Sequence, residues 1–227
     1  MKSPWAGKKQ VVEQHAIKRL AVLKAAAHAF IERGYHQTSL DDLAETLNVT
    51  KPTLYYYIKN KEEILYECKK IALETMTEAM AAAEQQGHNG LERVLAILRA
   101  YAGCILDDFG MCLVLLNDSS LNPEIRVKLK ELELHLNRQG CKYIEQGIAD
   151  GSILARDSKL IRYFIVGAIN WIPRWYRESG KLSREQIIEQ FLTYARNVMV
   201  APPLVAVAPA AEPSPAKTRV RKSKSSS

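Results

Sequence analysis

Apolar residues between positions 38 and 58 repeat with the period of an α-helix and predict two short helices joined by a tight turn. In the first segment, Leu40, Leu43, Ala44 and Leu47 follow the i, i+3, i+4, i+7 spacing of one helical face. In the second segment, Leu54 and Ile58 lie four residues apart and are expected to point inward. The pattern therefore predicts two packed helices with little chain between them.

Polar residues at the edges of these segments supply the signals that start and stop helices. Thr38 or Ser39 offers the side-chain oxygen that caps the first helix. Asn48 follows this helix, and Asn is second only to Gly in the left-handed conformation that ends helices. Thr50 caps the second helix, and Pro52 lies in its first turn, where the amide has no intrahelical partner. Helix, sharp turn and helix form the unit whose second helix enters the DNA major groove.

The second helix carries Tyr55, Tyr56 and Tyr57, of which at least two are expected to be exposed. An exposed aromatic cluster indicates a binding surface, because phenols bond phosphate oxygens and their rings pack on thymine methyl groups. Ordinary core packing remains the alternative, most of all for Tyr57. Lys61 begins the next helix, where its charge favours a phosphate. The residues expected to contact DNA are Thr38, Ser39, Thr50, Lys51, Pro52, Thr53, Tyr55, Tyr56, Tyr57 and Lys61.

This segment resembles the DNA-binding domain of TetR-family transcriptional regulators, which often carry T-L-Y-x-Y-F followed by K-(N/S)-K-E-x-L. The chain reads T-L-Y-Y-Y-I from Thr53 and K-N-K-E-E-I-L from Lys59. The resemblance covers roughly residues 15 to 66 and includes an earlier helix that ends in E-R-G-Y. Asn48 and Ile58 replace the usual Gly and Phe, and Pro52 stands where Gly is common. These departures leave the base preference open.

The remaining chain predicts further helices and no strands, because no period-two pattern is sustained. A long helix from Lys61 to about Gln86 is expected to connect two domains, and Gly110 is expected to interrupt the helices that follow. The predicted fold is all-α: a three-helix helix-turn-helix DNA-binding domain and a helical ligand-binding and dimerisation domain. The expected divisions are a flexible basic arm at 1–14, the DNA-binding domain at 15–60, the second domain at 61–200 and a disordered basic tail at 201–227.

Two apolar stripes near the end of the chain predict a subunit interface. The first runs along the helix that Asp157 caps, and the second along the helix that Ser183 and Gln186 start with a capping box. Two such helices can pair with their copies as a four-helix bundle. TetR-family regulators dimerise through their last two helices, so the resemblance implies the same here. The expected interface residues are Phe164, Ala168, Ile172, Phe191, Ala195 and Val198.

The segment from Gly167 to Ser183 resembles a TetR subgroup that regulates fatty-acid and steroid catabolism and includes proteins responding to acyl-coenzyme A. Trp171, Arg174 and Trp175 lie in this segment, beside Pro173, which is expected to kink the helix. The two tryptophans either line an acyl pocket or anchor the dimer interface. The expected pocket residues are Cys104, Phe109, Met111, Leu113, Leu116, Tyr143, Trp171, Arg174 and Trp175. Their apolar character suits a hydrophobic or amphipathic ligand.

Composition and charge agree with a DNA partner. The chain has 227 residues and a formal net charge of +7, and residues 1–60 carry nine Lys and Arg against five Asp and Glu. The four cysteines show no C-x-x-C spacing and the histidines are scattered, so no structural zinc site is expected. No resident cofactor is expected either. No apolar run approaches the length of a membrane span, and no signal peptide is evident, so a cytoplasmic protein with reduced thiols is expected.

The sequence therefore predicts a regulator, most simply a repressor, that binds a palindromic double-stranded DNA operator as a homodimer and is released by a small inducer. An architectural DNA-binding protein of the same fold without an inducer is one alternative. An all-α enzyme is the other, although G-x-S-x-G, H-E-x-x-H and Gly-rich phosphate-loop motifs are all missing from the sequence. His135 and Glu131 share a helix face, but two ligands are too few for a metal site.

Overall fold

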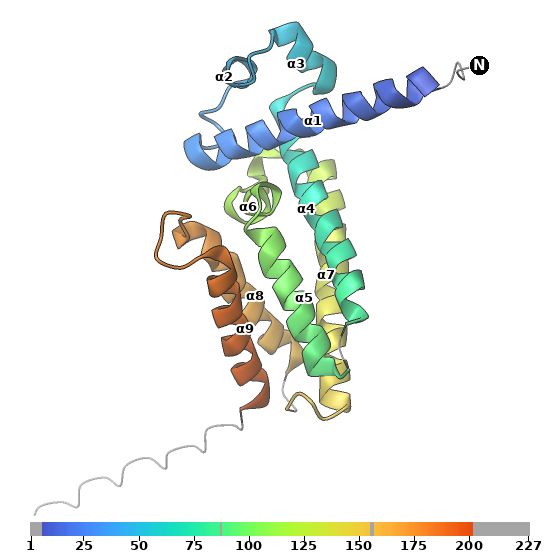
Figure 1. The fold of residues 1–227 in the computed structure, drawn as a ribbon, viewed down its shortest axis with the longest axis vertical. Helices are drawn as coiled ribbons and strands as arrows, with labels where there is room; N and C mark the ends of the chain where they lie inside the picture. Colours follow the sequence, from blue (N-terminus) through green and yellow to red (C-terminus); the bar gives the residue numbers. More distant parts are fainter. Residues whose placement is uncertain (1–5, 87, 155–156, 202–227) are drawn as a thin grey trace, which may run out of the picture.

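The computed structural model describes residues 6–86, 88–154 and 157–201, and over these residues the chain is helical without strands, as predicted (Figure 1). The elements are α1 (Ala6–Arg33), α2 (Leu40–Thr46), α3 (Lys51–Tyr57), α4 (Lys61–Glu84), α5 (Gly90–Ile105), α6 (Asp108–Leu115), the short 3₁₀ helix η1 (Asp118–Ser120), α7 (Pro123–Ala149), α8 (Ser158–Trp175) and α9 (Arg184–Val200). None of these helices combines the length and the apolar character that crossing a bilayer requires.

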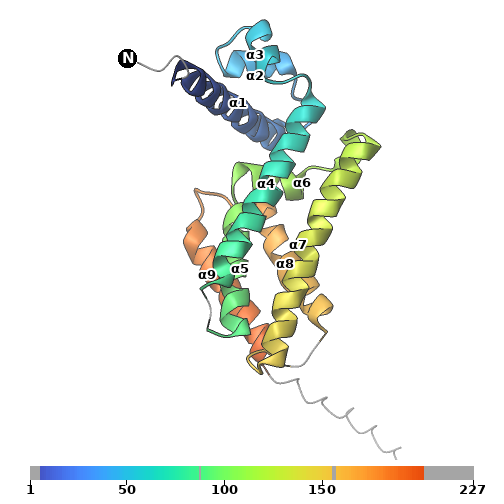
Figure 2. The ribbon, with the colours of Figure 1, turned by 90° about the vertical axis from the view of Figure 1, so that its right-hand side faces the viewer.

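The helices form two units that share α4. Helices α1, α2 and α3 lie at one end of the molecule, and α4 runs from them into a bundle with α5, α7, α8 and α9 (Figures 1 and 2). The first hydrophobic core joins α1–α3 to the first half of α4 through residues such as Phe30, Leu54 and Leu65. The second core lies in the bundle and includes Met80 and Ile165. Because α4 contributes to both cores, it fixes one unit against the other.

Capping residues set the helix boundaries much as the sequence predicts. Ser39, rather than Thr38, caps α2, and it forms a reciprocal capping box with Asp42. Thr50 caps α3 with Pro52 in the first turn, and the left-handed Asn48 between the helices has a φ of 52°. The predicted caps of the later helices, Asn122, Asp157 and Ser183, are all present. Short polar side chains therefore determine where the helices of this fold begin.

The structure corrects two boundary predictions. Helix α1 begins at Ala6, so residues 6–14 are helical rather than part of a flexible arm. Gly110 lies inside α6 and does not interrupt it. Pro173 lies inside α8, in its last turn, two residues before the helix ends at Trp175. The predicted basic tail falls almost wholly outside the described residues, as do residues 1–5.

Two buried thiols lie where α1 packs on α4 and α6. The Cys68 Sγ of α4 is 3.7 Å from the Leu23 carbonyl oxygen, and the Cys112 Sγ of α6 is 3.9 Å from the Ala27 carbonyl oxygen. Leu23 and Ala27 are one turn apart on α1, so both thiols donate toward the same face of that helix. The contact is dry, since both cysteines are fully buried.

A glycine makes the sharp corner between α5 and α6 possible. A Cβ added to Gly110 would lie 1.9 Å from the carbonyl oxygen of Cys104 and 2.8 Å from the Cα of Ile105. Both neighbours are backbone, so no side-chain rotation can relieve the contact. Because α6 also packs on α1, this corner helps to position the first unit on the bundle.

We expect Gly110→Ala to lower the free energy of unfolding by about 3 kcal/mol, because two helix backbones must separate. Gly103→Ala is the matched control, since its nearest neighbour is the far end of Arg184 at 3.9 Å. The control should be neutral or stabilise α5 by about 0.5–1 kcal/mol. Urea denaturation of both variants measures the difference, and equal stabilities would contradict the role given to this corner.

Candidate DNA-facing surface, cavity and apolar face

Helix α3 is held by its inner residues and presents its other faces to solvent. Leu54 and the C-capping Ile58 are each 1% exposed and anchor α3 in the first core. Tyr55 is 52% and Tyr56 is 69% exposed, which confirms that at least two of the tyrosines lie on the surface. Lys51, Pro52 and Thr53 are exposed on the same short helix. Helix α3 lies at the outer end of the molecule, away from the bundle (Figure 1).

Tyr57 is partly a structural residue. It is half-buried, and the ring of His15 from α1 lies 4.9 Å from its ring and 5.2 Å from that of Tyr56. Arg19, also on α1, donates to the Tyr57 carbonyl oxygen at 3.3 Å and pairs with Glu63 of α4 at 3.2 Å. These contacts fix the orientation of α3 against both α1 and α4.

The expected DNA-facing hydroxyls and cations have different surroundings. Thr38 is 1% exposed and donates to the carbonyl oxygens of Ala29 and Gly34, so its prediction as a DNA-contacting residue is wrong. Ser39 and Thr50 are exposed helix caps. The Lys51 Nζ lies 2.6 Å from a carboxylate oxygen of Asp41, and this hydrogen bond raises the pKa of Lys51.

Lys61 occupies a less exposed position than Lys51. Its Nζ lies 4.6 Å from the centre of the Tyr35 ring, and burial lowers its pKa. The aromatic ring offers a partial counter-charge on one side of the ammonium group. Lys61 is nevertheless at the start of α4, where the helix N-terminus adds to the positive potential.

A cavity with two lobes lies between the bundle helices. The inner lobe, of about 70 Å³, is almost wholly apolar, and the outer lobe, of about 460 Å³, contains several polar groups. Both lobes are lined by Tyr101, Leu136, Asn137, Arg162 and Val166. The shared residues place the two lobes next to each other. Leu73 and Met76 of α4 line the outer lobe, and Met80 of the same helix lines the inner lobe.

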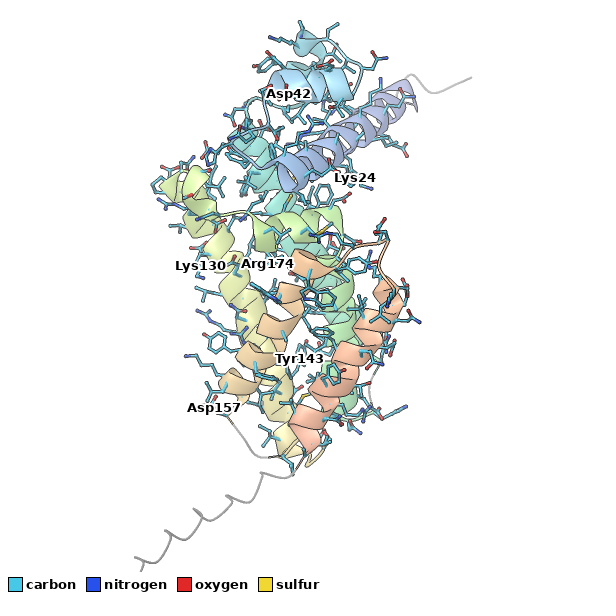
Figure 3. All side chains as sticks on the ribbon, turned by 90° about the vertical axis from the view of Figure 1, so that its left-hand side faces the viewer. Lys24, Asp42, Lys130, Tyr143, Asp157 and Arg174 are labelled. Carbon is cyan, nitrogen blue, oxygen red and sulfur yellow. The ribbon has the colours of Figure 1, made fainter. Side chains whose placement is uncertain are left out.

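Only part of the predicted pocket lines this cavity. Tyr143 lines the inner lobe, and Leu113 and Arg174 line the outer lobe. Figure 3 shows Arg174 toward the α1 end of the bundle and Tyr143 farther along it. Six of the predicted residues line neither lobe: Cys104, Phe109, Met111, Leu116, Trp171 and Trp175. Phe109 and Leu116 pack against the first core instead, because α6 lies against α1.

Polar groups in the cavity are held by neighbours from several helices. The Tyr101 hydroxyl donates to the Asn170 Oδ1 at 2.7 Å, and burial raises the pKa of Tyr101 to about 12. Arg162 donates through Nη1 to the Asn137 Oδ1 at 2.8 Å. Arg174 donates to the Val114 carbonyl oxygen at 3.3 Å and thereby ties α8 to α6. Tyr101, Asn137 and Arg162 line the cavity and were not predicted from the sequence.

An apolar face on α8 and α9 is open to solvent. On α8, Phe164 is 64%, Trp171 is 60% and Trp175 is 44% exposed, with the half-buried Ala168 between them. On α9, Phe191 and Val198 are half-buried. The Trp175 ring stacks on Phe191 at 6.3 Å, which joins the two helices into one surface. The apolar face therefore consists of Phe164, Ala168, Trp171, Trp175, Phe191 and Val198.

Two residues predicted for this interface are buried inside the bundle. Ile172 is 0% and Ala195 is 3% exposed, and both belong to the second core. Each stripe in the sequence is wide enough to include an inward and an outward face, and these residues point inward. The outward position of Trp171 and Trp175 favours their role as surface anchors over a role in the cavity. Among the described residues, no three His, Cys, Asp or Glu side chains gather as metal ligands do.

Two family models match the chain, one for each unit. The model described as "Bacterial regulatory proteins, tetR family" matches residues 22–68, and the model described as "Tetracyclin repressor-like, C-terminal domain" matches residues 87–199. A protein named "Fatty acid metabolism regulator protein" from Bacillus subtilis is 28% identical over 75% of this chain and 89% of its own length. The "HTH-type transcriptional repressor KstR2" from Mycolicibacterium smegmatis is 24% identical over 79% of this chain and 89% of its length.

A solved structure supports the fold. The crystal structure of AibR in complex with isovaleryl coenzyme A and operator DNA matches with a TM-score of 0.69 at 23% identity. The match covers 78% of this chain and 96% of that one. At this identity the likeness concerns the arrangement of the helices.

We expect Tyr56→Ala to weaken specific DNA binding by about 1–3 kcal/mol, because it removes the most exposed ring of α3. Tyr56→Phe keeps the ring contacts with His15 and separates them from any phosphate bond of the hydroxyl. Fluorescence anisotropy with a selected DNA fragment measures both variants, and circular dichroism checks their fold. Loss of helical structure in Tyr56→Ala would show that the ring is structural.

Proposed function

Because the chain belongs to the TetR family of bacterial regulatory proteins, we propose that it is a repressor that binds a palindromic operator as a homodimer and releases it on binding an effector. The observation that carries the proposal is the surface of α3. Tyr55 and Tyr56 are exposed beside Lys51 on a helix whose inner side is anchored by Leu54. A short, firmly seated helix with exposed aromatic and cationic groups is suited to entering a major groove.

The apolar face of α8 and α9 supports dimerisation. Large aromatic side chains such as Phe164 and Trp171 expose more than half of their surface. Monomeric proteins seldom expose such groups together, whereas Trp and Phe are enriched where subunits meet. Pairing α8 and α9 with their copies would form a four-helix interface and present two α3 helices to one DNA. Helices about 34 Å apart read successive turns of the major groove, which is why the operator is expected to be palindromic.

The two-lobed cavity supports a small amphipathic effector. Its inner lobe is apolar and its outer lobe offers Arg162, Arg174 and Asn170. Relatives named for fatty-acid metabolism and for KstR2, and a structural neighbour bound to isovaleryl coenzyme A, agree with an acyl compound. An acyl-coenzyme A thioester has a hydrocarbon end, which suits the apolar inner lobe, and a polar, anionic remainder, which suits the outer lobe.

Helix α4 provides a route from the effector to DNA. Leu73, Met76 and Met80 line the cavity, and the same helix begins at Lys61 beside the DNA-facing surface. A ligand that fills the cavity and shifts α4 would alter the separation of the two α3 helices. The ligand must bind the DNA-released form more tightly, and a coupling of about 1–3 kcal/mol changes DNA affinity about 5- to 150-fold.

The test of this function is to select genomic fragments with the purified protein at near-physiological salt and to sequence them. A short palindrome recovered upstream of a few genes would support a specific dimeric regulator. Acyl-coenzyme A compounds are then added to the protein–operator complex. Fragments without a shared motif, or an operator complex that no effector disrupts, would favour an architectural DNA-binding protein.

We expect Phe164→Asp to separate the dimer, because it places a charge within the apolar face. Val127→Asp is the control, since Val127 is 58% exposed on α7, outside that face. Sedimentation equilibrium should show monomers for Phe164→Asp and dimers for Val127→Asp, with the palindrome bound more weakly by the former. A dimer that survives Phe164→Asp would contradict the assignment of the interface.

A further inference from the structure

Arg162 is a buried cation at the place where the two lobes of the cavity meet. It lies on α8, is 9% exposed, and lines both the inner and the outer lobe. Its neighbours on the same side of the helix are apolar, including Ile165 and Ile169, which belong to the second core. A charged side chain in such surroundings loses hydration and requires polar partners in return.

The partners of this guanidinium are incomplete. Nη1 donates to the Asn137 Oδ1 at 2.8 Å, and the ring of Tyr163 lies 4.5 Å from the guanidinium carbon. Nε is shielded from water and has no hydrogen-bond partner, alone among the buried side-chain nitrogen and oxygen atoms of the described residues. The edge formed by Nε and Nη2 is therefore unused, while the opposite edge and one face are occupied.

No carboxylate of the described residues forms an ion pair with Arg162. Glu133 lines the outer lobe, yet the pair is absent from the salt bridges of the described part of the chain. The free edge of an arginine, with two parallel N–H groups, matches the two oxygens of a carboxylate and can also bind a single carbonyl oxygen. A ligand oxygen would supply the bond that the protein leaves unmade.

We propose that Arg162 binds the acyl oxygen of the effector through its Nε and Nη2 edge. The hydrocarbon end lies in the inner lobe, and the polar remainder extends through the outer lobe toward Arg174. The inference rests on the proposed function, since it assigns chemistry to the effector of that regulator. The acyl oxygen can belong to a free carboxylate or to a coenzyme A thioester. Because Nε is shielded in the free protein, either bond requires the guanidinium to turn toward the ligand.

Arg162→Met isolates this role from packing. The stem of Arg162 lies against Gly140, where an added Cβ would be 3.4 Å from the Arg162 Cδ. Met keeps an unbranched apolar stem at this contact and removes only the guanidinium. Because that group is incompletely bonded in the free protein, we expect the thermal stability of Arg162→Met to equal or exceed that of the wild type. A purely structural arginine would instead lower it.

Binding to the full-length protein is measured by calorimetry. The probes are fatty acids, acyl-coenzyme A thioesters and S-alkyl coenzyme A thioethers, each with a short, a medium and a long hydrocarbon chain. The thioether lacks the acyl oxygen but keeps both ends of the ligand. We expect the wild type to prefer the thioester over the thioether by roughly 10- to 100-fold, as a charge-assisted hydrogen bond provides. Arg162→Met should lose this preference while binding the thioether as the wild type does.

Preference for the fatty acid over the thioester would identify the free carboxylate as the source of the oxygen and would also support the proposal. The proposal is overturned if no acyl probe binds the wild type, or if Arg162→Met still prefers the thioester over the thioether. Arg162→Lys serves as a second variant should Arg162→Met not fold, because Lys keeps the charge and lacks the paired donors. Operator binding without probe is measured in parallel, so that failure of the proposed function is recognised separately.

Discussion

The packing of α4 into two hydrophobic cores is the constraint on which the rest of the structure depends. Ile64, Leu65 and Cys68 belong to the core shared with α1, while Met80 and Ala83 belong to the core of the bundle. The helix is continuous between them from Lys61 to Glu84. Close-packed interiors do not yield gradually, so a displacement at one core is transmitted to the other or resisted by both. The position of the DNA-facing surface therefore depends on how α4 packs in the bundle.

The two buried cations of the described chain differ in how completely their donors are hydrogen-bonded. Lys69 of α4 is 2% exposed and is satisfied by the Leu116 carbonyl oxygen at 2.7 Å and by Asp118. Through these two partners it fixes the segment after α6 against α4. Arg162 is nearly as buried but has an unpartnered Nε. A satisfied buried charge holds a structure together, whereas an unsatisfied one is suited to a bond that forms later.

Local signals explain why the first unit was predictable from the sequence. Capping residues such as Ser39 and Thr50 and the positive-φ Asn48 act within a few positions of the helices that they bound, so the order of residues is enough. The same holds for the exposure of Tyr55 and Tyr56, which follows from the inward positions of Leu54 and Ile58. The prediction for Thr38 was wrong because its hydroxyl, although it precedes α2, donates to the Ala29 carbonyl oxygen of α1.

The cavity depends on contacts between distant segments, which explains the weaker prediction there. Helix α6 was expected to line it and supplies only Leu113 and Val114, because α6 also packs against α1. Helices α4, α5, α7 and α8 supply most of the lining. Ile172 and Ala195 were misplaced because a broad apolar stripe does not reveal which edge meets a second copy. Arg162 had a signal in the sequence: it lies three, four and seven residues before the apolar Ile165, Val166 and Ile169. A cation in line with an apolar face indicates a buried charge.

The reactivity of the thiols between α1, α4 and α6 depends on whether α1 is packed on the other two helices. Hydrogen bonding with Cys112, together with burial, raises the pKa of Cys68, and the thiolate is the reactive form of cysteine. Cys104 and Cys141 are only half-buried. Alkylating reagents will therefore modify the latter pair in the closed protein and reach Cys68 and Cys112 only when α1 separates from its supports. The rate of that second modification reports how often the two units part.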